Sequence, residues 1–208
     1  MVRWGVAVDL KSCVGCQTCT MACKLDNVTP PEVQWRSVRD VEVGTYPSVR
    51  RFFLPVQCMH CANPPCMEVC PTKATRRRSD GIVYIDYEKC MGCGFCLLAC
   101  PYDARSLVRE QTGYFETGGQ SPESPRPFGA ATKCDFCLDR IDLGMKDGHK
   151  PGTTPEVTPV CVNSCPAKAL YFGDLDDPES ELSKIIKARD STRLHLEMGT
   201  DPSVYYLW

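Results

Sequence analysis

The sequence predicts an α+β fold of two similar units, with long loop insertions and a C-terminal helix and tail. All sixteen cysteines fall into four groups of four. Alternating apolar residues, which predict short strands, precede two of these groups. In these segments VAVDLKSC (residues 6–13) matches VYIDYEKC (residues 83–90), and each has an aspartate four residues before its first cysteine. A repeat of this kind indicates that one unit was duplicated.

We call the four cysteine groups runs one to four. Runs one and three share the spacing C-x2-C-x2-C-x3-C, run two has a longer second gap, and 23 residues divide run four into two pairs. Run one is Cys13, Cys16, Cys19 and Cys23; run two is Cys58, Cys61, Cys66 and Cys70; run three is Cys90, Cys93, Cys96 and Cys100; run four is Cys134, Cys137, Cys161 and Cys165.

The spacing of run three, with the proline that follows it, is that of bacterial two-cluster ferredoxins. In those proteins the fourth cysteine of a run ligates the other cluster. Three thiolates at short spacing surround one cluster, and the fourth lies on what is expected to be a short helix. Sixteen thiols therefore fit four 4Fe–4S clusters. We predict that each unit is ferredoxin-like, with two strands, two cluster loops and two short helices.

A P-x-x-A tetrapeptide follows the last cysteine of three runs, at residues 71–74, 101–104 and 166–169. Its proline lacks an N–H group and restricts the residue before it, so we expect it to close the turn that carries the last cysteine. Run one has Lys24 instead, and its last cysteine is expected on a helix through TMACKLDN. We expect Lys24 to be a solvated surface residue; the alternative is that it lies between two clusters and raises a reduction potential.

Zinc and disulfides are the alternatives for these cysteines. C-x2-C pairs also form zinc ribbons, and run four alone is ambiguous between the two metals. Runs one and three favour iron–sulfur clusters, because three thiolates at x2-x2 spacing followed by x3-C recur far more often with iron than with zinc. Disulfides are disfavoured, because neighbouring C-x2-C cysteines at this density would give strained pairings.

Composition and motifs argue against several classes of function. The formal net charge of −2 argues against a nucleic-acid partner. No segment approaches the roughly 18 apolar residues of a membrane-spanning helix, and the start, MVRWGVAVDLKSC, does not have the pattern of a signal peptide. No dinucleotide-binding, P-loop or nucleophile-elbow motif occurs. With every thiol assigned to a cluster, we predict one-electron transfer and no catalytic site of the chain's own.

The segments between and after the runs give further expectations. Residues 24–57 contain aromatic residues, Trp35 among them, that are expected to shield clusters from water. Residues 111–131 predict an irregular loop suited to a partner. DDPESELSKIIKARD predicts a helix with Asp177 as its N-cap. Its apolar stripe, expected to pack on the core, is Leu182, Ile185 and Ile186. The tail PSVYYLW predicts a strand that is covered by this chain or by another.

Two basic features near runs two and three carry weaker signals. His60, inside CMHC, is expected to donate a hydrogen bond to a cluster sulfur or to contact a partner. It is not expected to be a ligand, because the thiol count is already complete. The three consecutive arginines at residues 76–78 predict a solvated basic turn.

Taken together, the four runs resemble those of a known family. Further marks are LKSCVGCQTCTMACK, PVQCMHCANPPC, SDGIVYIDYEKCMGCGFCLLACPY and the late GDLDDPES. The chain is similar to the four-cluster iron–sulfur (beta) subunits of the dimethyl sulfoxide reductase family of molybdenum oxidoreductases. Within it, the arsenate, polysulfide, thiosulfate, tetrathionate and sulfoxide reductase types are most similar. Some nitrate reductase-like relatives have tryptophan in place of one cysteine of run three; here Cys93 is intact, which implies four four-iron clusters.

The resemblance implies how the runs combine. Residues 1–57 with 134–208 would form the first ferredoxin-like unit from runs one and four, residues 58–110 the second from runs two and three, and residues 111–133 a loop insertion. The implied cluster ligands are Cys13, Cys16, Cys19 and Cys165; Cys23, Cys134, Cys137 and Cys161; Cys58, Cys61, Cys66 and Cys100; and Cys70, Cys90, Cys93 and Cys96. The first unit would face the catalytic subunit. The tail would help to bind that subunit, so deleting the tail is expected to weaken the complex and to leave the clusters intact.

The resemblance also implies partners. These are a large catalytic subunit with a molybdenum (or tungsten) bis-pterin guanine dinucleotide site, and a membrane quinol/quinone subunit or a soluble redox carrier. The expected location is the periplasm or the outer face of the cytoplasmic membrane, with export alongside the catalytic subunit; a cytoplasmic complex is the alternative. A free-standing polyferredoxin and a zinc-binding interaction module stay as competing functions.

Overall fold

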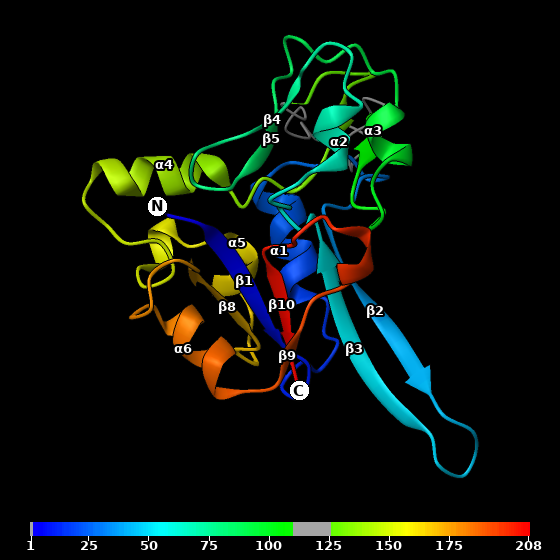
Figure 1. Cartoon of the computed structure of the whole chain (residues 1–208), viewed down its shortest axis with the longest axis vertical. Coiled ribbons are helices and arrows are strands. Elements are labelled where there is room, and N and C mark those ends of the chain that lie inside the picture. The colour runs from blue at the N-terminus through cyan, green and yellow to red at the C-terminus, as the bar shows by residue number, and fades with distance from the viewer. Residues whose placement is uncertain (1, 110–125) are drawn as a thin grey trace, which may run out of the picture.

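The computed structural model describes residues 2–109 and 126–208 and has the predicted α+β architecture. Figure 1 shows two halves along the long axis: a four-stranded sheet with its helices below, and short strands and helices above. Most of the predicted loop insertion lies outside the described residues, which resume at residue 126.

The four-stranded sheet joins the two ends of the chain. Its strands lie in the order β8 (Leu170–Asp174), β1 (Trp4–Asp9), β10 (Val204–Leu207) and β9 (Ser191–Thr192). β1 is parallel to β10 and antiparallel to β8. All six residues of β1 are buried, because Trp4, Val6 and Val8 point into the main core and the opposite face is also covered.

Helix α6 (Glu181–Ala188) covers that opposite face of the sheet (Figure 1). The predicted apolar stripe packs there as expected: Leu182 is fully buried against Ala7 of β1 and Leu207 of β10. Ile185 and Ile186 lie at the margin of the same cluster.

The predicted N-cap of this helix is wrong. The helix begins after Ser180, whose hydroxyl accepts a hydrogen bond from the Ser183 N–H at 3.0 Å. Asp177 instead accepts from the Glu179 N–H at 2.9 Å and so closes a turn before the helix. Ser180 also donates its hydroxyl to the Asp174 carbonyl at 2.6 Å, which ties the helix start to the end of β8.

The C-terminal tail is an interior strand of the sheet. β10 lies between β1 and β9, and Val204, Tyr206 and Leu207 are buried. The Tyr206 hydroxyl donates to the Pro55 carbonyl at 3.0 Å. The tail is thus covered by this chain, and its deletion would remove the middle of the sheet. This position contradicts the expectation that the tail can be removed without loss of the clusters, whereas its contact with a partner stays a prediction.

Strands β2 (Arg36–Val43) and β3 (Arg50–Gln57) form a long antiparallel hairpin. Trp35 and Val56 are buried at its base, whereas its far end projects clear of the body in Figure 1. Tyr46, at the tip, is 89% exposed. The prediction that residues 24–57 shield the interior therefore holds for the base of the hairpin and is wrong for its tip.

The upper half is built from short elements. Strand β4 (Thr75–Arg77) pairs with β5 (Val83–Ile85), and β6 (Ser106–Leu107) pairs with β7 (Ala131–Thr132). Helices α2 (Pro65–Glu68) and α3 (Phe95–Leu98) lie beside them (Figure 1). The basic turn is only partly as expected: Arg76 and Arg77 are exposed, but Arg78 forms ion pairs with Asp80 and Asp142, both at 2.8 Å.

The remaining helices belong to runs one and four. They are α1 (Thr18–Asp26), α4 (Leu138–Lys146) and α5 (Val160–Asn163), with short 3-10 turns at Pro155–Val157 and Leu196–Met198. α1 confirms the predicted helix through TMACKLDN, and it packs against α5. No helix within residues 2–109 or 126–208 is long and apolar enough to cross a membrane.

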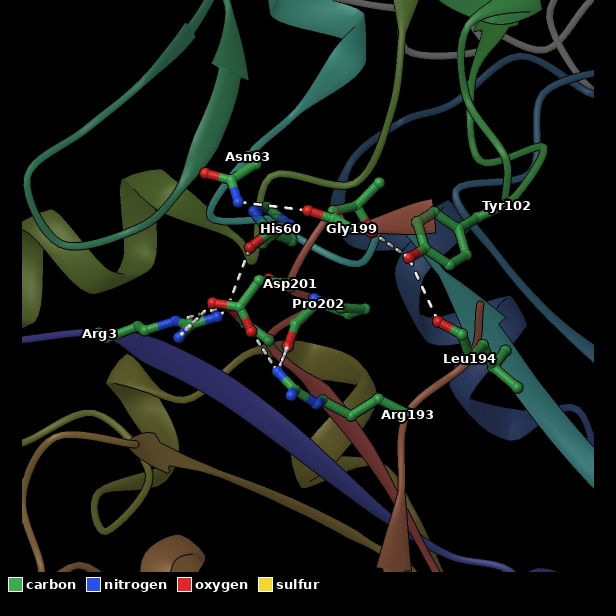
Figure 2. A network of polar contacts seen from close by, with 11 residues as sticks. Arg3, His60, Asn63, Tyr102, Arg193, Leu194, Gly199, Asp201 and Pro202 are labelled. Carbon is green, nitrogen blue, oxygen red and sulfur yellow. Dashed lines mark hydrogen bonds and ion pairs between the residues drawn. The ribbon is translucent and has the colours of Figure 1, made fainter. Parts of the chain in front are cut away.

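The segment at residues 193–203 ties the two halves together by polar contacts (Figure 2). Asp201 forms ion pairs with Arg3 and Arg193. The Ser203 hydroxyl donates to the His60 carbonyl at 2.9 Å, and further contacts reach the side chains of Asn63 and Tyr102. Because His60 and Asn63 flank Cys61, this segment holds the loop of run two against the sheet.

Candidate iron–sulfur cluster sites

Each run places its third cysteine on a short helix. The helices are α1, α2, α3 and α5, and they carry Cys19, Cys66, Cys96 and Cys161, all of them buried. In runs one to three the first two cysteines lie in the loop before that helix, whereas in run four Cys134 and Cys137 come before α4, which lies between them and α5 in the chain. All sixteen cysteines lie in the described ranges, and none of them forms a disulfide.

The P-x-x-A tetrapeptides form the same turn three times. The third residue has a positive φ in each: 53° at Lys73, 52° at Asp103 and 49° at Lys168. Its N–H donates to the carbonyl of the last cysteine of the run. The alanine that follows can then direct its N–H to the cysteine sulfur, and the Ala169 N–H lies 3.3 Å from the Cys165 sulfur. The turn therefore supplies a hydrogen-bond donor to the thiolate.

Such donors act on the pKa of Cys70, the last cysteine of run two. Burial raises the pKa of Cys70, but the N–H groups of Thr75 and Ala74 and the hydroxyl of Thr72 outweigh burial and leave that pKa below its ordinary value. The lower pKa favours the thiolate, which is the form that ligates metal.

Strand pairing joins run one to run four and run two to run three. β1, before run one, pairs with β8, after run four. β5, before run three, pairs with β4, after run two. In both pairs the repeated aspartate donates its N–H to the P-x-x-A alanine: Asp9 to Ala169 at 2.8 Å, and Asp86 to Ala74 at 2.9 Å. The repeat seen in the sequence is thus also a repeat of backbone hydrogen bonds.

Three cavities are each lined by four cysteines, three from one run and one from the run paired with it. The cysteines lining them are Cys13, Cys16, Cys19 and Cys165; Cys23, Cys134, Cys137 and Cys161; and Cys70, Cys90, Cys93 and Cys96. Within the described residues, no three histidine, cysteine or acidic side chains are grouped closely enough to hold a single metal ion. The four thiols of each set stand instead around the wall of a larger space.

The remaining four cysteines are neighbours as well. Burial raises the pKa of Cys61 to about 12, and the nearby thiolates of Cys58, Cys66 and Cys100 contribute to the rise. Burial also raises the pKa of Cys66, with smaller contributions from the thiolates of Cys58 and Cys100. The structure therefore brings together four sets of four thiols.

Two of these sets meet across the boundary between the halves. Burial raises the pKa of Cys134 well above its ordinary value, and the thiolates of Cys23 and Cys161 in its own set add to the effect. Cys58, from the set of runs two and three, acts on the same thiol. A set of runs one and four therefore adjoins a set of runs two and three.

The donor chemistry fits 4Fe–4S clusters. Four crowded, buried thiolates repel one another and are unfavourable without a bound metal, as the raised pKa values of Cys23, Cys61 and Cys134 indicate. The fully buried guanidinium of Arg36 lines one of the cavities, and its Nε and Nη2 have no hydrogen-bond partner in the part of the chain that the structure describes. An anionic, sulfur-rich group bound by the thiolates in that cavity would relieve their repulsion and would accept hydrogen bonds from the Nε and Nη2 of Arg36.

Buried basic residues around the sets are what sequence reasoning missed. Lys24 was expected in solvent, but it is buried and its Nζ donates to the carbonyls of Pro30, Pro31 and Val33 at 2.6–3.2 Å. Arg36, Arg105 and Lys133 are also buried. In the sequence Arg36, Arg105 and Lys133 are single basic residues, which are usually solvated, so no pattern marked them. Lys24 was marked only by its place after run one, where the other runs have proline.

Of the two roles expected for His60, one stays a prediction, the hydrogen bond to a cluster sulfur. His60 is fully buried, so the alternative that it contacts a partner is wrong. Its Nδ1 accepts from the Val83 N–H at 3.1 Å, and its ring stacks on Phe136 with centroids 3.6 Å apart. Burial lowers its pKa well below the ordinary value, with help from the charges of Lys133 and Arg105, so the imidazole is neutral.

Comparison with known proteins places these sites in a family. The 4Fe-4S dicluster domain matches the chain twice, over residues 12–74 and 49–116. The chain is 40% identical to the B subunit of the selenate reductase of Mesobacillus selenatarsenatis, over 99% of this chain and 72% of that protein. It is also 40% identical to a putative dimethyl sulfoxide reductase iron–sulfur subunit of Halobacterium salinarum, over 100% and 79%. Identity to the arsenate respiratory reductase iron–sulfur subunit of a Shewanella species is 32%, over 99% and 96%.

The matches to relatives span almost the whole chain, and the domain matches cover runs one, two and three. The matched domain binds 4Fe–4S clusters, which is the chemistry that the thiol sets fit. The chain belongs to the iron–sulfur (beta) subunits of the dimethyl sulfoxide reductase family of molybdenum oxidoreductases, and it is a 4Fe–4S electron-transfer subunit of a reductase complex.

Proposed function

We propose that this chain holds four 4Fe–4S clusters and conducts electrons between a molybdopterin catalytic subunit and a second redox partner. The observation that carries the proposal is that three cavities are each lined by four cysteines drawn from two runs. The effects of Cys58 and Cys100 on the pKa values of Cys61 and Cys66 support a fourth set of the same kind.

In this proposal each set supplies four thiolates to one cluster. A bound 4Fe–4S cluster supplies one-electron oxidation and reduction. The chain's own residues bind it, donate N–H groups to its cysteine ligands and exclude water with apolar side chains such as Trp35 and Phe136, which line one cavity. Because the last cysteine of each run belongs to the paired set, each run holds two adjacent sites together.

The partners in this proposal follow from relatives and from the family resemblance. Relatives are named as the B subunit or the iron–sulfur subunit of a reductase, which supports a separate catalytic chain. A molybdenum bis-pterin guanine dinucleotide would belong to that chain alone. A quinol/quinone membrane subunit or a soluble carrier would be the second partner. A position at the outer face of the cytoplasmic membrane stays a prediction from the resemblance.

Metal analysis tests the cluster count. The native complex is purified without oxygen, and iron and acid-labile sulfide are measured per chain. We expect about sixteen of each, four per cluster. Eight or fewer irons in intact, folded protein would contradict the proposal.

Composition of the same preparation tests the partners. A second, much larger chain and stoichiometric molybdenum (or tungsten) are expected to copurify with this one. A chain that purifies alone from its native source with all its iron would contradict the partner proposal and support a free-standing carrier.

A further inference from the structure

Two buried arginines lie in corresponding places. One is beside the two cysteine sets of runs one and four, and the other is beside the two sets of runs two and three. Arg36 is the first residue of β2 and is 2% exposed; Arg105 directly precedes β6 and is 5% exposed. Arginine is almost never this buried unless it is paired, because removing the charge from water is costly. Both must therefore face anionic groups inside the protein.

Arg36 lies between the two sets of runs one and four. Its Nη1 is 3.7 Å from the sulfur of Cys161, and the residue lines the cavity of that set. The sulfurs of Cys161 and of Cys19, a member of the other set, both interact with its guanidinium. Its remaining nitrogens, Nε and Nη2, have no acceptor among the described residues.

Arg105 lies between the two sets of runs two and three. Its Nη2 is 3.0 Å from the sulfur of Cys66, and its Nη1 donates to the Thr75 hydroxyl at 3.2 Å. The sulfurs of Cys66 and of Cys96, a member of the other set, both interact with its guanidinium. Each arginine thus contacts one set directly and is close to a thiol of the set next to it.

We propose that Arg36 and Arg105 each lie close to two neighbouring clusters, and that the positive charge of each arginine raises the reduction potentials of both of its clusters. Reduction adds a negative charge to a cluster, and a cation in the low-dielectric interior stabilises the reduced form. Charge near a cluster and hydrogen bonds to its sulfurs are known determinants of its potential. Because one cation serves two clusters, it shifts both in the same direction. The inference rests on the proposed four-cluster function.

Redox titration followed by electron paramagnetic resonance tests the inference on the full chain in its complex. Arg36→Gln and Arg105→Gln remove the charge and keep a polar side chain. In each variant we expect the ratio of reduced to oxidised cluster, at fixed ambient potential, to fall about tenfold for both clusters of the affected pair. For a one-electron couple this corresponds to a downward shift of about 59 mV. The other pair should be less affected.

Matched controls separate this role from a general loss of charge. Arg39→Gln removes an exposed arginine from the same strand as Arg36, and Arg76→Gln removes an exposed one near Arg105. Neither should shift the potentials. Arg36→Lys and Arg105→Lys, which keep the charge, should restore most of the wild-type potentials.

The outcomes distinguish this inference from the function beneath it. Wild-type protein with eight or fewer irons contradicts the four-cluster function itself. Fully loaded glutamine variants with unshifted potentials overturn only the role of the arginines. If the glutamine variants lose iron, the lysine variants decide: retained iron at wild-type potentials supports the role of charge, and equal loss of iron overturns it.

Discussion

The two aspartates of the sequence repeat occupy the same backbone position in different surroundings. The carboxylate of Asp9 is buried and accepts from the Arg189 guanidinium at 2.6 and 3.0 Å. That of Asp86 is partly buried and forms an ion pair at 2.6 Å with the exposed Lys89. The Arg189 guanidinium lowers the pKa of Asp9 far below its ordinary value, against the opposing effect of burial and with help from Ser12.

We therefore predict unequal effects of removing these two charges. Asp9→Asn is expected to destabilise the protein by about 2 kcal/mol. The Arg189 guanidinium and the N–H groups of Lys11 and Ser12 would then donate to a neutral amide oxygen, which is a weaker acceptor than the carboxylate. Asp86→Asn should cost less, because a surface ion pair contributes little. Thermal unfolding of the two purified variants compares them directly, and equal losses would contradict the assignment of a structural role to Asp9 alone.

The contribution of Asp9 should also depend on pH. Its pKa is lower in the folded chain than in the unfolded chain, so the stabilisation is fully present above the unfolded value, about 3.9, and is lost as the pH falls below it. The difference in melting temperature between wild type and Asp9→Asn should stay constant from pH 8 to pH 5 and shrink below about pH 4. A difference that grew on acidification would contradict this.

Two glycines in equivalent loop positions make a second residue-scale comparison. Gly15 in run one and Gly92 in run three have φ values of 69° and 72°. A Cβ at Gly92 would lie 2.1 Å from the Gly129 carbonyl oxygen, which is backbone, whereas one at Gly15 would meet the ring of Phe53 at 2.5 Å. Both alanine variants carry the cost of the left-handed conformation, about 1–2 kcal/mol.

Gly92→Ala is thus expected to be the more damaging variant, because a backbone carbonyl yields less than a side chain on an open hairpin. Iron retention during mild heating should be lower for Gly92→Ala than for Gly15→Ala. Equal retention, or the reverse order, would show that the Gly92 loop and its Gly129 neighbour separate at little cost.

At the scale of elements, the central position of β10 gives the next prediction. Deleting residues 203–208 removes the buried side chains of Val204, Tyr206 and Leu207 and exposes the residues that they contact. Burial of each of these three side chains contributes about 1.5–3 kcal/mol to the free energy of unfolding. Their sum is comparable to the whole stability of a typical domain, about 5–15 kcal/mol. The truncated chain should not accumulate as folded, iron-loaded protein.

The hairpin tip provides the matched control for this truncation. Replacing residues 44–49, all of which are exposed, by a short turn should leave soluble yield and iron per chain unchanged. A chain truncated at residue 202 that kept its full iron would contradict the place given to β10.

The elements also show where sequence patterns suffice and where they do not. Alternation predicted the strands before runs one and three, and the stripe of Leu182 predicted the buried face of α6, because both are local patterns. The N-cap of α6 depends on a contact between Ser180 and Asp174 across the end of β8, so the local preference for Asp177 chose the wrong residue. The direction of the hairpin likewise depends on distant parts of the chain.

At the scale of the whole molecule, spacing predicts more than composition does. The C-x2-C-x2-C pattern indicates how three thiols gather, and the family resemblance indicates which runs combine. The buried cations could not be found this way, because Arg36, Arg105 and Lys133 approach the thiols only once the chain has folded. A basic residue next to a buried aromatic one, as Arg36 is next to Trp35, is the only local signal, and it is weak.

The central claim is that each cluster takes three cysteines from one run and the fourth from the paired run. Serine replacement at Cys100, Cys66 and Cys96, followed by paramagnetic resonance of the reduced protein, tests it most directly. Cys100→Ser is predicted to perturb the same cluster signal as Cys66→Ser and to leave the signal altered by Cys96→Ser unchanged. If Cys100→Ser instead shares its signal with Cys96→Ser, each run holds its own cluster and the account is contradicted.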